Sequence, residues 1–479
     1  MALDLAPECV SSPPLALDER GVASLDGQWE LIPGDHDPAR LDEGEALPVT
    51  VPGLWEPQGL LELDGHAWYR TRFALHDPAG SWTLRFGAVM DIADVYLNGT
   101  LLGSHDSPFT PFELDAAPAL RAGENELSVR VFDPAADDPE HLLLPHGKQG
   151  WANDVFPSRP SLYLTYGGIW QTVTLRRHGP VVVRDLFVLP DPDDVRIVVE
   201  TERRPEAGDD PVELLVRALG RVIWWTGRQT EEIRRHELTL GATAARRWSP
   251  DHPALHRATV DLLVGGVPSD AREARFGLRT ISVERDRILL NGSPLRMKAA
   301  LVQGFSATRL YAEDDPDAIR EEVLLAKRMG FNTLRLHIKA FDPAYLDVCD
   351  EVGMLAYCDV PVAEPVAHDQ LDEGTVVAAR AVRAATEQVR RDRNHPSVLL
   401  WSAMNELCLD RPDVRASDAY ERFARLLAGA ARCVCFSSDL LAQQTRSEGQ
   451  ASCQSRLGEC HPLHSRTSNL PGRQTPPAP

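Results

Sequence analysis

The sequence places an amide and a carboxylate directly after a short apolar run. Residues 394–407 read NHPSVLLWSAMNEL, so Asn405 and Glu406 follow the apolar residues 398–401. A run of this kind is typical of a buried strand, and parallel β/α folds keep functional groups at the carboxyl ends of their strands. Glu406 is therefore a candidate general acid or base, with a carboxylate that caps the next loop as the alternative interpretation.

Other polar residues end two earlier apolar runs. Arg335, His337 and Lys339 lie within or just after NTLRLHI, and Asp359 ends MLAYCD. Arg335 can orient carboxylates through its planar guanidinium, or it can be a salt-bridged residue at a strand end. His337, Lys339 and Asp359 are interpreted as pocket-lining groups or as satisfied polar groups at the rim. Trp401 is a candidate apolar wall that would raise the pKa of a neighbouring acid.

The stretch DRNHPSVLLWSAMNE, residues 392–406, resembles the acid/base signature of glycoside hydrolase family 2. Members often end this strand with Gly-Asn-Glu, and Met404 occupies the place of that glycine here. The resemblance implies that Glu406 is the general acid/base and that Asn405 donates to the sugar 2-hydroxyl.

The resemblance extends over nearly all of residues 25–430. LDGQWEL, DVYLNGTLLG and GGIWQTVTL are similar to the sugar-binding domain of the family, and FGLRTISVERDRILLNGSPL is similar to its sandwich domain and barrel entry. The family more often has Arg-x-x-His before Tyr-Pro, whereas His337 here follows Arg335 by two residues. The resemblance implies hydrolysis of β-linked sugars by a retaining double displacement, and it leaves open whether the sugar is a galactoside, glucuronide or mannoside.

The elements that position these residues follow from the apolar periodicity. Residues 1–179 alternate short apolar runs with turns, including Asn98-Gly99, and are predicted to form a jelly-roll β-sandwich. Residues 180–281 are predicted to form an immunoglobulin-like β-sandwich. Strand and helix patterns then alternate four times over residues 282–432, which predicts the first half of a (β/α)8 TIM barrel. The predicted fold class is thus multidomain β plus α/β.

The remaining residues, 433–479, break this pattern. They contain one aromatic residue, four of the eight cysteines and no sustained apolar period, so they are predicted to be a disordered tail. The change favours truncation or a change of reading frame inside the barrel, with a natural flexible extension as the alternative. The spacing of the cysteines and histidines fits no zinc pattern, so no metal is predicted.

Retaining hydrolysis needs two carboxyls about 5 to 5.5 Å apart. The family resemblance implies a nucleophilic glutamate on a strand after Glu406. Glu448 and Glu459 lack flanking apolar runs, so neither is assigned and the nucleophile stays unknown. We therefore expect this polypeptide to be inactive or severely impaired alone. Two alternatives are a non-catalytic carbohydrate-binding or assembly protein and one half of a split glycosidase.

The amino-acid composition limits the classes of binding partner that can be expected. With 50 Lys and Arg residues against 71 Asp and Glu residues, the formal charge is −21, which disfavours nucleic acid and anionic membranes. The first residues lack a basic, apolar leader, and no long apolar run is present, so a cytoplasmic location is expected. No cofactor is predicted, and the expected partners are a β-glycoside substrate, a second copy of the chain or a complementing barrel half.

Overall fold

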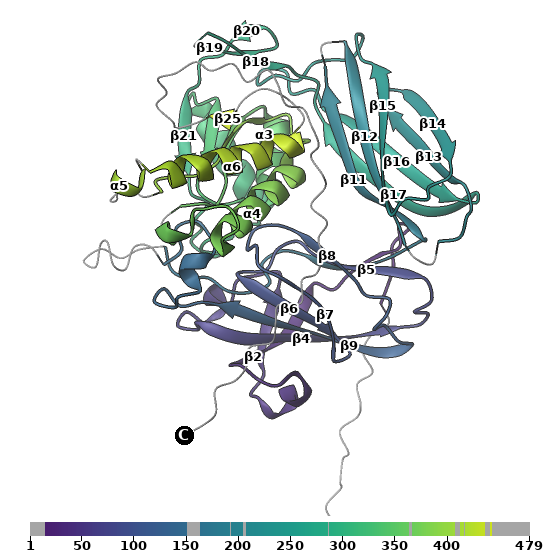
Figure 1. Cartoon of the computed structure of the whole chain (residues 1–479), viewed down its shortest axis with the longest axis vertical. Helices are drawn as coiled ribbons and strands as arrows, with labels where there is room; N and C mark the ends of the chain where they lie inside the picture. Colours follow the sequence, from purple (N-terminus) through teal and green to yellow (C-terminus); the bar gives the residue numbers. More distant parts are fainter. Residues whose placement is uncertain are drawn as a thin grey trace, which may run out of the picture. The chain divides into compact units, whose positions relative to one another are not determined.

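The computed structural model describes residues 15–150, 163–191, 193–204, 207–285, 287–363, 366–407, 412–415, 417–435 and 441–442. Figure 1 shows antiparallel strands in the first part of the chain and a mixture of strands and helices in the last part, coloured green to yellow. None of the helices in these ranges is long and apolar enough to cross a membrane. The predicted fold class, β plus α/β, is confirmed.

The first region is a sandwich of two antiparallel sheets. One sheet has the order β3-β2-β4-β9-β6-β7 and the other β1-β10-β5-β8. Trp29, Tyr69 and Trp82 are buried in the core of this region. The strands are β1 (Val22–Ser24), β2 (Gly27–Pro33), β3 (Leu47–Val51), β4 (Gly65–Leu75), β5 (Ser81–Phe86), β6 (Ile92–Leu97), β7 (Thr100–His105), β8 (Phe112–Asp115), β9 (Gly123–Asp133) and β10 (Val173–His178), with 3-10 helices η1 (Pro38–Glu43), η2 (Glu56–Gln58) and η3 (His141–Leu143).

The predicted hairpin at Asn98-Gly99 is present. Leu97 pairs with Thr100, so the loop between β6 and β7 has two residues. Asn98 and Gly99 adopt φ values of 52° and 78°, which is the positive φ that a tight two-residue turn requires.

The second region is a smaller antiparallel sandwich. Its sheets have the orders β11-β12-β15 and β14-β13-β16-β17. In β13 the apolar Val212, Leu214 and Val216 are buried and alternate with more exposed residues, as expected for a half-buried strand. The strands are β11 (Val181–Pro190), β12 (Asp194–Arg203), β13 (Val212–Ala218), β14 (Arg221–Gly227), β15 (Ile233–Gly241), β16 (His256–Val264) and β17 (Val267–Phe276).

The third region is a parallel sheet of order β21-β22-β23-β24-β25 with helices between its strands. A small antiparallel sheet precedes it, formed by β18 (Ile281–Glu284), β19 (Arg287–Leu290) and β20 (Ser293–Pro294). The elements of the parallel region are β21 (Ala299–Val302), α2 (Pro316–Arg328), β22 (Thr333–Leu336), α3 (Pro343–Val352), β23 (Leu355–Asp359), η4 (His368–Gln370), α4 (Val376–Asp392), β24 (Val398–Ser402), α5 (Pro412–Arg415), α6 (Asp418–Cys435) and β25 (Leu441–Ala442).

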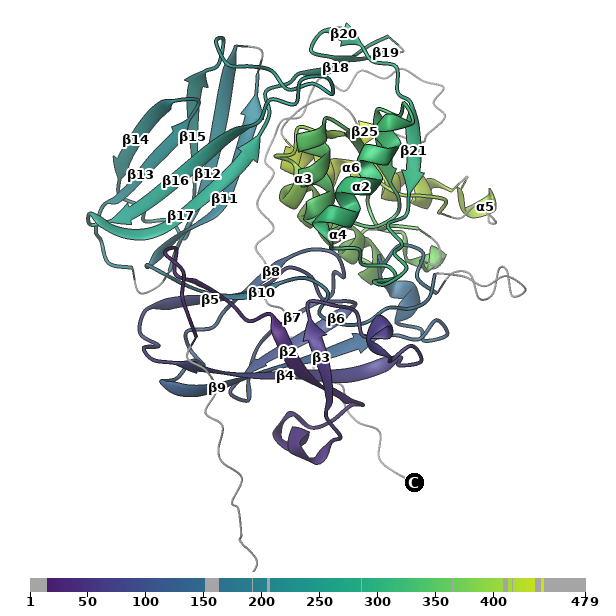
Figure 2. The same ribbon diagram turned by 180° about the vertical axis from the view of Figure 1, so that it is seen from behind.

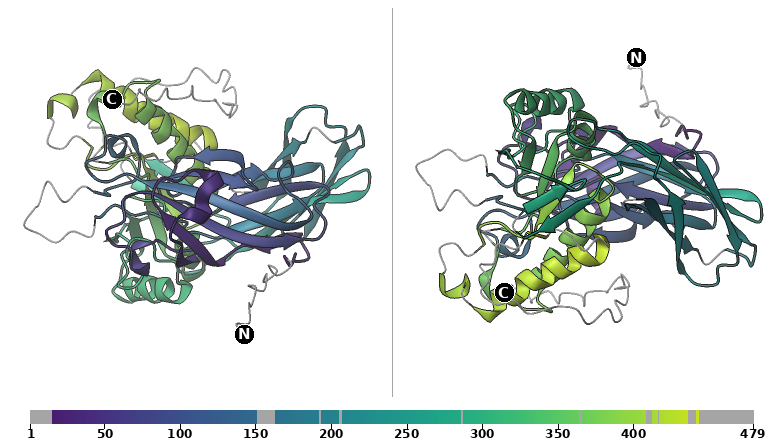
Figure 3. Two further views of the ribbon diagram at one scale, coloured as in Figure 1. Left: turned by 90° about the horizontal axis from the view of Figure 1, so that it is seen from below. Right: turned by 90° about the horizontal axis from the view of Figure 1, so that it is seen from above.

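Local sequence explains where these helices begin and end. Asp315 caps the first turn of α2 through its side chain, Asp342 caps α3, and Thr375 caps α4. The left-handed Gly353 ends α3, which is the usual role of glycine after a helix. Helices α2 and α3 pack side by side (Figure 2), as do α4 and the yellow-green α6 (Figures 1 and 3).

The number of strands in the parallel sheet differs from the four that the sequence predicted. Helix α6 continues to Cys435, and β25 pairs in parallel with β24 through Trp401 and Leu441, so the described sheet has a fifth strand. Both features extend into the segment predicted to lack regular structure. A strand of two residues carries no apolar period, so the sequence pattern could not reveal it. Apart from the backbone of these elements, residues 433–479 lie outside the described residues.

Two cysteines in the third region, Cys349 and Cys358, are buried and free. Cys9 and Cys408 lie outside the described residues.

Candidate active site

The carboxyl ends of β22, β23 and β24 bring three polar side chains together. Arg335 Nη2 donates to Asp359 Oδ2 at 3.0 Å and to Asn405 Oδ1 at 2.7 Å, while Nε donates to Asp359 Oδ1 at 3.1 Å. The guanidinium also lies over the ring of Tyr357, 5.0 Å from its centroid. Because a guanidinium presents its donors in one rigid plane, Arg335 fixes the carboxylate and the amide relative to each other.

Asp359 is the buried anchor of this group. Its carboxylate is fully buried and also bonds to His337, whose Nδ1 lies 2.8 Å from Oδ2. The backbone oxygen of Asp359 accepts from Gln388 Nε2 on α4 at 3.1 Å. Both carboxylate oxygens therefore have partners, which suits a group that holds its neighbours in position.

A strained backbone segment presents the Asn405-Glu406 pair. Asn405 N donates to Val362 O at 2.9 Å, which ties the loop after β24 to the loop after β23. Glu406 has a φ of 50°, in the left-handed region, which costs a residue with a side chain about 1 kcal/mol. Strain of this kind gathers at functional sites, where surrounding contacts maintain it.

Glu406 Oε2 accepts a hydrogen bond from Lys148 Nζ, which reaches it from the first region of the chain. The Lys148 side chain is buried, whereas 43% of the Glu406 side chain is exposed. The hydrogen bond from Lys148 lowers the pKa of Glu406, and His337 adds to this effect. The carboxyl is thus held ionised, contrary to the expectation of a raised pKa.

Two predicted site residues lie elsewhere. Trp401 belongs to the core between the sheet and its helices, together with Cys349 and Ala431, and so does not form a wall beside Glu406. Lys339 is buried among aromatic rings, 3.6 Å from the centroid of Tyr311, and donates to the Tyr311 backbone oxygen.

Lys339 therefore supports the loop after β21 rather than lining an open pocket. Its Nζ also lies 3.3 Å from Gly304 O, in the same loop. Burial places the pKa of this amine well below its ordinary value.

Lys148 and Tyr163 also lie at the site, although the sequence pattern gave no sign of either. Lys148 Nζ lies 5.9 Å from the ring centroid of Tyr163, and the Tyr163 hydroxyl donates to Gln303 Oε1 at 2.8 Å. The nearby Glu406 carboxylate contributes to the raised pKa of Tyr163, after burial. Both residues precede the parallel sheet by more than one hundred residues, so no periodicity connects them with its strand ends.

One group of side chains has the composition of a metal site. Ligand atoms of Asp347, Asp350 and His395 lie within 4.8 Å of one another. However, His395 Nδ1 bonds to Asp350 Oδ2 at 2.7 Å, and the Arg275 guanidinium donates to Asp347. Because these contacts already compensate the carboxylates, the group is an ion-pair junction between β17, α3 and the segment before β24.

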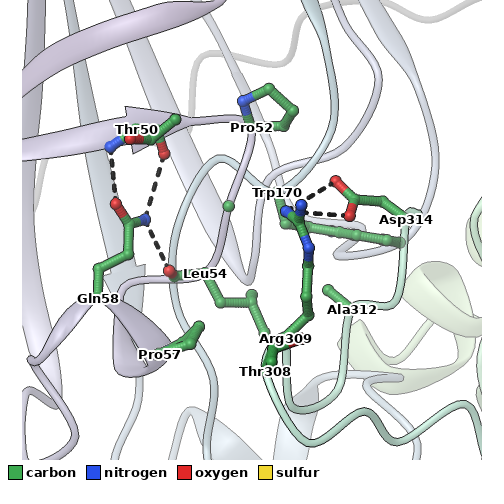
Figure 4. Close-up of a pocket in the computed structure, with 11 residues that line it drawn as sticks. Thr50, Pro52, Leu54, Pro57, Gln58, Trp170, Thr308, Arg309, Ala312 and Asp314 are labelled. Carbon is green, nitrogen blue, oxygen red and sulfur yellow. Dashed lines mark hydrogen bonds and ion pairs between the residues drawn. The ribbon is translucent and has the colours of Figure 1, made fainter. Parts of the chain in front are cut away.

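A separate pocket of about 400 Å³ lies between the end of β3 and the loop after β21 (Figure 4). Gln58 hydrogen bonds to Thr50 and Leu54 on one side, and Arg309 pairs with Asp314 on the other. None of its lining residues belongs to the group around Glu406.

Comparison with known proteins identifies the class to which this fold and site belong. The family description "Glycosyl hydrolase 2 galactose-binding domain-like" matches residues 62–160, "Glycosyl hydrolases family 2" matches residues 181–279, and "Glycosyl hydrolases family 2, TIM barrel domain" matches residues 281–448. Together they cover most of the chain and all three regions of the fold. The chain belongs to glycoside hydrolase family 2.

Individual relatives support this family assignment. A β-galactosidase of Thermoanaerobacter pseudethanolicus is 23% identical over 82% of this chain and 53% of its own length. A β-glucuronidase of Streptococcus agalactiae is 24% identical over 82% of this chain and 68% of its own length. The structure of Bifidobacterium dentium β-glucuronidase complexed with coumarin-3-O-glucuronide matches 88% of this chain and 74% of that chain with a TM-score of 0.71 at 25% identity. The chain thus spans about half the length of the first relative.

Proposed function

We propose that the chain acts in the hydrolysis of β-linked glycosides and that Glu406 is its general acid/base. The observation that carries this proposal is the array at the carboxyl ends of β22 to β24, where Arg335 joins Asp359 to Asn405, directly before Glu406. In a retaining double displacement, such an acid protonates the leaving oxygen and then, as a carboxylate, deprotonates the attacking water. The β-galactosidase and β-glucuronidase relatives support a β-glycoside as the substrate.

Asn405 has the geometry of a substrate donor. Its Oδ1 accepts from Arg335, which directs Nδ2 away from the guanidinium. Nδ2 is buried and makes no hydrogen bond of ordinary geometry among the described residues, although the Asn405 side chain helps to lower the pKa of the adjacent Glu406. A buried donor without a partner is costly, and a sugar hydroxyl would satisfy it. We assign this donor to the sugar 2-hydroxyl.

Glu406 needs a proton before it can act as an acid. Since Lys148 lowers the pKa of Glu406, the carboxyl is ionised while the pair is closed. In our proposal the ion pair weakens when a glycoside binds, because the glycosidic oxygen then competes for the space beside the carboxyl. While the Lys148–Glu406 pair is closed, Glu406 is a carboxylate. This is the base form that deprotonates the attacking water in the second step.

The second carboxyl is the missing part of the mechanism. Among the described residues, the polar groups that interact with Glu406 are Lys148, His337, Tyr163, Arg335 and Asn405, and none is a carboxylate. Asp359 is bonded through both oxygens to Arg335 and His337. We therefore infer that residues 1–479 alone hydrolyse glycosides slowly or not at all. A complementing barrel half, a second copy and a cytoplasmic location remain our expectations.

Glycoside binding tests the site directly. Saturation-transfer NMR with 4-nitrophenyl β-D-galactoside and β-D-glucuronide is expected to detect binding of at least one of these sugars by the purified chain. Asn405→Ala should weaken that binding about tenfold, the effect of losing one buried hydrogen bond of roughly 1.4 kcal/mol. Glu321→Gln on α2, which alters an exposed carboxylate, is the matched control. Binding that Asn405→Ala leaves unchanged would place the sugar elsewhere.

A further inference from the structure

We propose that Lys148, from the galactose-binding-like region, is a positioning residue of the glycosidase site that holds the Glu406 carboxylate in place. This inference rests on the proposed role of Glu406. Lys148 Nζ donates to Glu406 Oε2 across 258 residues of sequence. A buried ammonium group in direct contact with a reactive carboxyl restricts both the rotamer and the charge of that carboxyl.

Buried contacts anchor the residues on either side of Lys148. On one side, His146 Nδ1 lies 2.9 Å from Asp91 Oδ2, and both side chains are almost completely buried. On the other side, Gln149 is fully buried, and its Oε1 accepts from the Tyr166 backbone N–H at 2.9 Å. A segment fixed on both sides presents Lys148 with little conformational freedom, as a positioning role requires.

The same segment contacts the barrel strands directly. Gly147 N donates to Pro361 O, just after β23, at 3.1 Å. Gly147 has a φ of 74°, and a Cβ at this position would lie 2.5 Å from Ile338 O, just after β22. Only glycine combines this backbone conformation with so close an approach. The loop is therefore seated on the ends of the two strands that carry Arg335 and Asp359.

Lys148 is the cation in direct contact with Glu406. Among the described residues, the other charged or titratable groups that face the carboxyl are Arg335 from β22, His337 from the loop after it, and Tyr163 from the loop before β10. Arg335 already hydrogen bonds to Asp359 and Asn405, and His337 already hydrogen bonds to Asp359. Removing Lys148 therefore leaves Glu406 without its direct cationic partner, although the other site contacts persist.

The test measures the ionisation of Glu406 in the full chain. The titration is monitored by NMR, with glutamate labelled with ¹³C at the carboxyl carbon. The Glu406 signal is identified as the one absent from Glu406→Gln. In the unsubstituted chain we expect its titration midpoint to lie below the ordinary glutamate value. Lys148→Met should raise the midpoint by about one pH unit or more, the scale of a direct charge pair, and Lys148→Arg should restore most of the difference.

Lys298→Met is the matched control, because Lys298 is exposed. It lies just before the amino end of β21, whereas the site lies at the carboxyl ends of the strands. The substitution should leave the midpoint unchanged. Gly147→Ala provides a second route if Lys148→Met does not fold, since it retains the amine but displaces the loop. We expect it to raise the midpoint as well.

An unchanged midpoint in a folded Lys148→Met or Gly147→Ala variant would overturn the proposal. This readout requires no turnover, so it is separate from the proposed function. Absence of hydrolysis leaves the titration result intact. Conversely, hydrolysis that is insensitive to Glu406→Gln would contradict the proposed function even if Lys148 controls the ionisation of that carboxyl.

Discussion

At the residue scale, Arg335 connects two polar side chains of the site. It bonds to the fully buried Asp359 and to the Asn405 amide at the same time. These interactions need a planar group with several donors, which a lysine ammonium cannot reproduce. Arg335 thus supports both the buried charge of Asp359 and the orientation of the proposed sugar donor.

We predict that Arg335→Met lowers the free energy of unfolding by about 3 kcal/mol, since it leaves a buried carboxylate with one fewer charged partner. Urea denaturation at neutral pH measures this loss. Arg425→Met on α6 serves as the control, because the Arg425–Glu421 pair is exposed and such pairs contribute little. Equal losses in the two variants would show that Arg335 is an ordinary surface arginine.

Sequence reasoning identified several residues that the structure brings together. Glu406, Asn405 and Asp359 end apolar runs, and parallel strands bring such ends to one edge of a sheet. It misplaced Trp401, because both faces of β24 are apolar and the period does not show which face meets the helices. Lys339 follows the end of β22 in a loop, and apolar periodicity does not determine the path of a loop.

At the element scale, the short helix η2 carries an unusual acid. Glu56 is buried, its Oε1 accepts from Gly167 N at 2.8 Å, and its Oε2 has no partner among the described residues. Burial raises the pKa of Glu56 to about 8. The carboxyl is therefore largely protonated in the folded chain at neutral pH.

This pKa has a definite consequence for stability. The folded pKa lies above the unfolded value, so the contribution of Glu56 is fully present below pH 4.5 and is lost as the pH rises through about 8. We predict that the chain loses stability between pH 6 and pH 9 and that Glu56→Gln removes part of this loss. Urea midpoints at the two pH values check this. Glu62→Gln, at an exposed position, should follow the unsubstituted chain, and an identical loss in Glu56→Gln would contradict the account.

The element pattern was largely readable from the sequence. The Asn98-Gly99 turn specifies its hairpin locally, and the alternation of strands and amphipathic helices specifies the β/α units. The end of α6 was set too early and β25 was not found. Both lie where a composition change obscures a weak local signal.

At the scale of the whole molecule, contacts between the first sandwich and the barrel helices explain how Lys148 reaches its place. Asp106 accepts from Arg380 Nε on α4 at 2.8 Å. Nearby, Thr110 Oγ1 donates to Glu387 Oε2 on the same helix at 2.6 Å. These contacts fix the sandwich to α4, so one region can supply a residue to a site on another.

Long-range assembly of this kind was the part that the sequence did not reveal. Lys148 lies in a segment without a strand or helix pattern, and its importance depends on the packing of two regions distant in sequence. The ionised state of Glu406 follows from that packing. The sequence pattern could predict the acid but not its partner.

The most direct test of the proposed incomplete site measures release of 4-nitrophenol from a panel of 4-nitrophenyl β-D-glycosides by the purified chain and by Glu406→Gln. We predict that folded protein of either kind releases 4-nitrophenol at or close to the rate in buffer. Of the two carboxyls that the described residues place at the site, Asp359 is buried and bonded to Arg335 and His337, which leaves Glu406 as the one available for the reaction. Turnover by the unsubstituted chain that Glu406→Gln abolishes would contradict this and reveal a nucleophile within the 479 residues.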